Sequence, residues 1–220
     1  MRQREVDATG LRLGLAAVAL SGVLTAAMIV VRGPFIDPAY TPEPFAQVGG
    51  SARWILYSLG TMLSVWLGVY GFFALYAYLA HTNRAVATQA FWGMVLNIGL
   101  VLLLPALGVY AFAGPPMADL YTREPQRAIA LSTELGSPAY LAIVVIQAVL
   151  YCVGSLLFGI AIWRCGTLPR WSGVLFFLQA PLIQFVPLIS YPGEIIGALM
   201  LAISNIWIAW VGWRRLGASP

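Results

Sequence analysis

The sequence contains no lysine, one histidine and two cysteines, and only 9% of its 220 residues are charged. So little charge cannot form the surface of a water-soluble domain, in which about 25% of residues are charged. The single histidine, His81, has no cysteine or second histidine beside it in the sequence. Its isolation disfavours a tetrahedral zinc site and a haem ligated from both faces. We therefore expect no cofactor and no metal site.

Sequence motifs of enzymes are also missing. The apolar runs hold no pair of carboxylates, and the chain has no Gly-rich phosphate loop and no base close in sequence to a serine nucleophile. Cys152 and Cys165 have no nearby metal-ligand partner, and we expect them at different depths in a membrane, so no disulfide is expected. The sequence favours a protein that is not an enzyme, although catalytic groups can assemble from distant parts of a chain.

What the sequence has in abundance is apolar residues, which make up 60% of the chain. A helix needs about 20 of them to cross a hydrocarbon core roughly 30 Å thick. Six such stretches can be counted. They lie near 12–31, 53–80, 89–113, 138–163, 172–190 and 194–213. Because these runs do not alternate apolar with polar residues, they predict an all-α, polytopic membrane helical bundle with one domain over 1–220, and disfavour a β-barrel.

Arginine sets the expected orientation of this bundle. If the N-terminus is inside, eight arginines fall on inner segments and four on outer ones. That distribution predicts a multi-pass protein of the cell membrane with both termini in the cytoplasm. The basic pI of about 9.3 is then a result of topology, and we expect the lipid bilayer as the main partner and no nucleic acid.

Two longer outer loops follow from the same arrangement, 32–52 and 114–137. The first is rich in proline, glycine and aromatic residues, which predicts a compact cover without regular helix. In the second, Ala128, Leu131 and Leu135 share one side of a possible short helix that would lie along the outer surface.

The inner turn carries a recognisable pattern. It reads Trp163-Arg164-Cys165-Gly166-Thr167-Leu168-Pro169-Arg170-Trp171-Ser172-Gly173. This turn resembles one found in a family of small bacterial six-helix membrane proteins of unknown function, as does the segment Leu107-Gly108-Val109-Tyr110-Ala111-Phe112-Ala113-Gly114. The resemblance covers about residues 10 to 215. It implies six helices and no particular reaction, cofactor or substrate.

The fifth apolar run is interrupted by polar residues and prolines. Gln179, Pro181, Gln184 and Pro187 all fall in its outer half. Each proline removes a backbone donor and frees a carbonyl, so this segment is expected to kink or to line a cavity where the freed groups find partners. Polar groups that only bond to adjacent helices would explain the same residues.

The last hairpin therefore supplies the candidate ligand-binding residues: Gln179, Gln184, Glu194 and Asn205. Gln179 and Asn205 both lie about 18 Å from the outer turn, so they share a level near the middle of the membrane. We expect both to point into the bundle, bonded to each other or to a neighbouring helix. Glu194 begins the sixth run, where the helix dipole favours a carboxylate; it could also form an outer-facing site for a cation or amine.

These residues are compatible with three functions. The preferred hypothesis is a non-enzymatic membrane protein that binds a small amphipathic or lipid ligand in the outer half of the bundle, or that serves as an accessory subunit of a membrane complex. A small-solute carrier is the second hypothesis. An intramembrane enzyme is the third.

Overall fold

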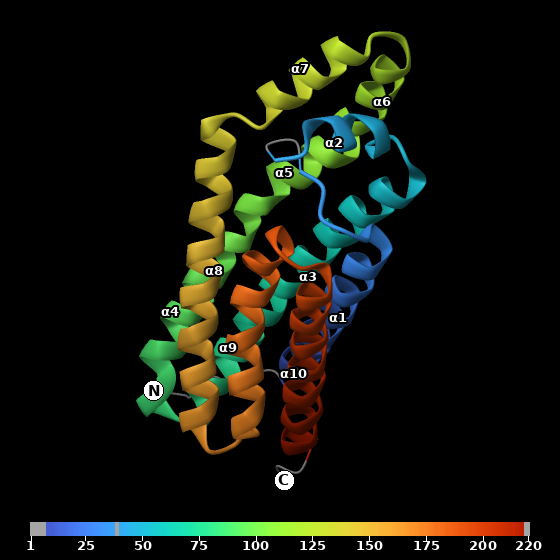
Figure 1. The fold of residues 1–220 in the computed structure, drawn as a ribbon. Coiled ribbons are helices and arrows are strands. Elements are labelled where there is room, and N and C mark those ends of the chain that lie inside the picture. Colours follow the sequence, from blue (N-terminus) through green and yellow to red (C-terminus); the bar gives the residue numbers. More distant parts are fainter. Residues whose placement is uncertain (1–7, 38–39, 218–220) are drawn as a thin grey trace.

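The computed structural model describes residues 8–37 and 40–217, which form helices and short connections with no strand among them (Figure 1). The all-α prediction is confirmed. Five helical stretches in this part of the chain are long and apolar enough to cross a membrane. They are Thr9–Arg32, Ala52–Thr82, Arg84–Arg123, Pro138–Cys165 and Tyr191–Gly217. The chain is therefore a helical bundle of membrane-protein type.

Four of these stretches correspond to one helix each. They are α1 (Ala8–Arg32), α3 (Ala52–Thr82), α8 (Pro138–Cys165) and α10 (Tyr191–Gly217). Several of these helices begin or end at residues that cap the helix. Ser51 and Ser137 accept hydrogen bonds from the third residue beyond them and start α3 and α8. Gly166, at φ +72°, ends α8 in the left-handed conformation that glycine adopts without strain.

The stretch Arg84–Arg123 is a chain of short segments. In order, these are η1 (Arg84–Val86), α4 (Ala87–Asn97), η2 (Ile98–Leu103), α5 (Leu104–Gly108), η3 (Val109–Ala113) and α6 (Gly114–Arg123). The tight 3₁₀ segment η2 precedes Pro105, and the π-helical segment η3 precedes Pro115 and Pro116. Prolines lack the N–H that a regular α-helix would bond to the preceding turn, so the helix changes its winding at these places.

The expected fifth span, 172–190, differs most from the prediction. Its helix α9 (Arg170–Gln184) has 15 residues, a length of about 22 Å, shorter than a hydrocarbon core of roughly 30 Å. Pro181 is accommodated inside α9, whereas Pro187 lies in the short turn η4 (Val186–Leu188). Pro187 has no backbone N–H to donate to the carbonyl oxygen of Ile183, so the regular hydrogen bonding of α9 is not continued there and the chain forms η4.

Six helical elements pack side by side in a closed ring. Going around it, α3 contacts α1, α1 contacts α10, α10 contacts α9, α9 contacts α8, α8 contacts α4, and α4 returns to α3. Small residues bring neighbours close: a Cβ built on Gly159 of α8 would lie 2.7 Å from the carbonyl oxygen of Gly173 in α9. Such contacts are typical of helices associating in lipid, where packing replaces the hydrophobic effect.

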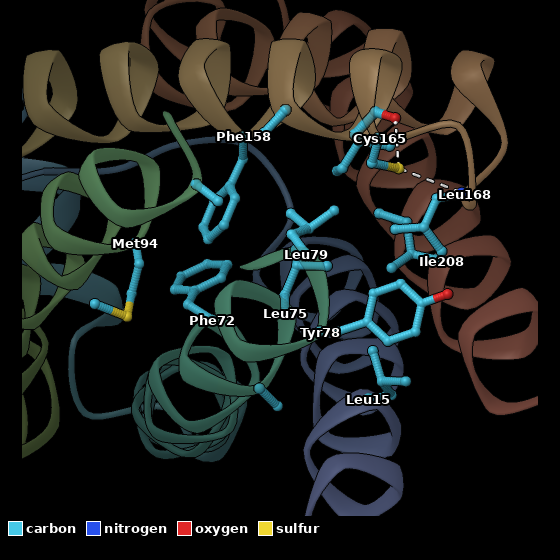
Figure 2. Close-up of a cluster of buried hydrophobic side chains, with 14 of the residues drawn as sticks. Leu15, Phe72, Leu75, Tyr78, Leu79, Met94, Phe158, Cys165, Leu168 and Ile208 are labelled. Carbon is cyan, nitrogen blue, oxygen red and sulfur yellow. Dashed lines mark hydrogen bonds between the residues drawn. The ribbon is translucent and has the colours of Figure 1, made fainter. Parts of the chain in front are cut away.

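One half of the ring interior is filled by a buried apolar cluster, part of which Figure 2 shows. Phe72, Phe158 and Phe176 meet there from three helices, with ring centroids 5.8 to 6.3 Å apart. Towards the predicted inner end the cluster continues through Leu75, Leu79 and other side chains. The predicted outer half holds a second buried cluster, which includes Phe45 and Trp54, and a cavity beside it.

The segment 32–52 corrects one prediction. It contains α2 (Pro42–Val48), so its prolines do not forbid regular helix. Pro42 and Pro44 sit at the start of α2, where the missing N–H would have no helical partner in any case. Phe45 of α2 is fully buried against Trp54 and Tyr110, with ring centroids 6.4 and 5.7 Å away. The helix α2 therefore packs mainly on the two helices of the segment 114–137, and Phe45 also reaches Trp54 at the start of α3.

The segment 114–137 holds two helices, because α6 extends to Arg123 and α7 (Pro125–Leu135) follows after Glu124. Both lie at the same end of the bundle as α2 (Figure 1). Ala128 and Ser132 form the buried side of α7. Leu131, expected on that side, is 37% exposed.

Candidate ligand cavity

A cavity of about 200 Å³ occupies the predicted outer half of the ring. Its wall is formed mainly by α1, α3, α8 and α10, and is completed by the η2–α5 segment and the end of α9. On α1 the lining runs from Ser21 to Arg32, and on α8 from Tyr140 to Tyr151. Each interval corresponds to about 16 Å of helical rise. Phe72, a member of the buried cluster, also lines the cavity, so the cluster closes the cavity at its deep end.

An ion pair lies at the outer end of the cavity. Arg32, the last residue of α1, donates through Nη2 to Oε2 of Glu194 in the first turn of α10, and both side chains are at most 3% exposed. The guanidinium also donates to the hydroxyl of Tyr57 at 3.4 Å and lies over the ring of that tyrosine. A cation at a helix C-terminus and an anion at a helix N-terminus are both favoured by the helix dipoles. The pair joins the first and the last described helix.

A second carboxylate, that of Asp37, also lines the cavity. Asp37 Oδ2 accepts from the hydroxyl of Tyr110 at 2.5 Å and from the hydroxyl of Tyr140 at 2.7 Å. Tyr110 belongs to the π-helical segment η3, and Tyr140 to the first turns of α8. Asp37 is 3% exposed, so this cluster fixes the segment after α1 to two other parts of the ring. Single π-helical turns occur frequently at functional sites.

Deeper in the cavity, several polar atoms have no hydrogen-bond partner among the residues that the structure describes. They are both amide atoms of Gln147, the hydroxyl of Thr61 and Oδ1 of Asn205. Gln147 is fully buried and Asn205 is 3% exposed. An unpaired polar group in such a position costs about 1–3 kcal/mol, so buried groups of this kind normally bond to water or to a ligand.

Other polar groups at this depth are paired. Thr25 and Ser21 on α1 bond to Ser64 on α3. Asn205 donates from Nδ2 to the carbonyl oxygen of Val18 at 3.0 Å, which joins α10 to α1. These pairs hold the wall together, and they leave Gln147, Thr61 and one oxygen of Asn205 to interact with the cavity contents.

The four residues predicted from the sequence fall into two groups. Gln184, Glu194 and Asn205 line the cavity. Gln179 is buried behind the wall, where it donates at 2.9 Å to the Tyr151 hydroxyl and at 2.9 Å to the Phe176 carbonyl oxygen. Gln179 and Asn205 are thus each bonded to a neighbouring helix, and no bond joins them to each other. Gln179 reaches the cavity only through Tyr151, which does line it.

Sequence reasoning did not assign Arg32, Asp37, Tyr140 or Gln147 to the site. Arg32 and Asp37 fall within the expected outer loop 32–52, where charged residues are ordinary. Gln147 carried a usable signal, because an amide in the middle of an apolar run is costly in lipid unless it faces the bundle interior.

The arrangement suits binding of a molecule with polar and apolar parts. The polar groups described above share the wall with aliphatic side chains such as Ile29, Leu103 and Val144. Within residues 8–37 and 40–217, no three His, Cys, Asp or Glu side chains gather in a way that could hold a metal ion.

Comparisons with protein-family models, with curated proteins and with solved structures gave no match. The family resemblance of the Leu-Pro-Arg-Trp turn therefore stays a prediction. Fold and site define a helical membrane protein with an internal cavity.

Proposed function

We propose that this chain is a non-enzymatic integral protein of the cell membrane that binds a small amphipathic or lipid ligand in the cavity. The observation that carries the proposal is the buried amide of Gln147, a residue of the cavity wall, which has no partner among the described residues. A ligand whose polar end bonds to Gln147 and Asn205 would satisfy these groups, and its apolar part would pack on the aliphatic wall.

In this proposal both termini are cytoplasmic, and α9 with η4 makes a short sixth crossing. The arginine distribution supports this orientation, because eight of the twelve arginines then lie inside. Arg32, Tyr140 and Glu194 then mark the outer end of the cavity, and the Phe72 cluster lies toward the cytoplasm.

Binding is favoured over transport by the packing below the cavity. Phe158 and Phe176 are fully buried behind Phe72, so a solute could pass to the other side only if this cluster repacked. An enzyme is disfavoured because the carboxylate of Glu194 is already held by the guanidinium of Arg32. A flux assay with the protein in liposomes tests the carrier hypothesis directly.

Native purification in mild detergent, followed by intact-mass measurement, tests the proposal. We expect wild-type protein to carry a non-covalent small molecule, and Gln147→Leu to lose most of it while the protein remains folded. Ser204→Ala is a matched control: Ser204 is buried and donates to the Ser172 carbonyl oxygen at 2.8 Å, but it does not line the cavity. The control should lose some stability and keep the ligand.

Two outcomes would contradict the proposal. If wild type and Gln147→Leu carry the same molecule equally, the cavity is not its site. Stoichiometric co-purification of a second protein, without any small molecule, would instead support the accessory-subunit hypothesis.

A further inference from the structure

The cavity reaches the side of the bundle as well as its outer end. Val145 on α8 is 53% exposed and Phe185, just beyond α9, is 44% exposed, yet both also line the cavity. A side chain that touches both the interior and the outer surface marks a place where the wall is one residue thick. We call the part of the wall that Val145 and Phe185 form the side opening.

The side opening results from the short α9. This helix ends at Gln184, whereas α8 continues well beyond that level toward the outer end of the bundle (Figure 1). After Phe185 the chain makes the tight turn η4 and enters α10 at Tyr191. Pro187 thus shortens one wall element and leaves the outer part of α8 without a full-length neighbour on that side.

The surface around the side opening is apolar. Ile146 and Val149 on α8, and Ile189 after η4, are 52%, 49% and 88% exposed. The sequence from Pro138 to Trp163 contains no charged residue. In a membrane this surface would meet hydrocarbon chains, so the side opening would connect the cavity with lipid and not with water.

The unpaired groups inside the cavity are all uncharged: a carboxamide at Gln147, a hydroxyl at Thr61 and an amide oxygen at Asn205. Together they offer donors and acceptors. They provide no charge to neutralise an ionised head group, which would be costly to bury among them. The one guanidinium that lines the cavity, Arg32, is already paired with Glu194.

The size of the cavity also restricts how much of a ligand can be enclosed. Its volume of about 200 Å³ is below the roughly 300–1,000 Å³ of pockets that enclose a drug-sized molecule. A long-chain molecule could place only its polar end and the first part of its chain inside. The rest would need a path out through an apolar gap.

From these observations we infer that the cavity takes an uncharged lipid with a hydroxyl or carbonyl head, which enters sideways between α8 and the end of α9. The head bonds to Gln147 and Asn205, and the chain leaves through the side opening. This inference rests on the proposed function and specifies its ligand class and its route of entry.

Photolabelling of the full chain in phosphatidylcholine vesicles tests the inference. The probe is hexadecanol with a diazirine near the hydroxyl end, and hexadecyl phosphate with the same diazirine is the charged comparison. We expect the alcohol probe to label peptides of α8 and α10, and excess unlabelled hexadecanol to reduce this labelling to a competed background. The phosphate probe should label the same peptides only at that background. Gln147→Leu should reduce specific labelling about fivefold, which corresponds to the loss of about 1 kcal/mol of hydrogen bonding.

Substitutions at the side opening test the route. Val145→Trp should block it and reduce labelling to the competed background. Val149→Trp is the matched control, because Val149 lies one turn further along the same helix, is similarly exposed and does not line the cavity. Phe185→Ala should have the opposite effect and speed up probe exchange, which keeps the test informative if Val145→Trp misfolds.

The outcomes separate the inference from the proposed function. If Val145→Trp leaves labelling unchanged and a substitution at Tyr40, near the outer end, abolishes it, the inference of entry from lipid is wrong. The cavity would still be a ligand site in that case. Equal specific labelling by alcohol and phosphate would overturn the uncharged class. If Phe185→Ala also exchanges no probe, and no small molecule co-purifies with wild type, both the inference and the proposed function are wrong.

Discussion

Removing one partner of the Arg32–Glu194 pair should destabilise the protein far more than removing both. Glu194→Gln keeps the size of the side chain but leaves the guanidinium without its counter-charge at a site that is 3% exposed. Breaking a buried pair in this way costs about 3–5 kcal/mol, whereas replacing both partners by apolar residues is often neutral. We therefore expect Glu194→Leu and Arg32→Met, like Glu194→Gln, to be strongly destabilising singly, and the double variant with Arg32→Met and Glu194→Leu to recover most of the loss.

Thermal unfolding in detergent micelles measures the effect. For a chain of this length, a loss of 3–5 kcal/mol corresponds to a fall in Tm on the order of 10 °C. The double variant isolates the coupling between the two sites, since independent changes would add. If each single variant shifts Tm by less than about 2 °C, or if the two effects add, the pair does not lie in a buried, low-dielectric environment and the description of the outer end is wrong.

Two further predictions concern the wall and the orientation. Gln179→Leu should reduce stability by about 1 kcal/mol, through loss of its bonds to Tyr151 and the neighbouring backbone, and leave ligand association within a factor of a few; complete loss of association would make Gln179 a ligand residue. On a cysteine-free background, a cysteine at Tyr40 should react with a membrane-impermeant thiol reagent from outside, and one at Thr167 only after the inner face is exposed. The reverse pattern would place the cavity in the cytoplasmic half.

Long apolar runs predicted the helices well, because a chain in lipid must satisfy its backbone internally and has few other solutions. Prolines caused the errors. Pro42 and Pro115 lie in first turns and begin helices, whereas Pro187 lies where a helix would have to continue and ends it. Whether a proline begins or ends a helix depends on where that helix starts. The start is set by how α2, α6 and α10 pack in the bundle, which cannot be read from the sequence.

The cavity was predicted only where polar residues interrupt the last hairpin. Gln184, Glu194 and Asn205 stood out against apolar neighbours and do line the cavity. Arg32 and Asp37 lie at the edge of an apolar run, where charge is ordinary, so their burial depends on which helices come together. The Arg32–Glu194 pair joins residues more than 160 positions apart in the chain, so no local sequence pattern predicts it.

The contact between α1 and α10 has a consequence for the order of biosynthesis. The face of α1 that receives Asn205, including Gly22 and the carbonyl of Val18, stays uncovered until the last described helix has been made and inserted. Until α10 is inserted, Arg32 lies at the membrane edge without its partner Glu194. The ring thus closes as a late step, and α3, which meets α1 independently of α10, keeps the first helix in place until the closing segment arrives.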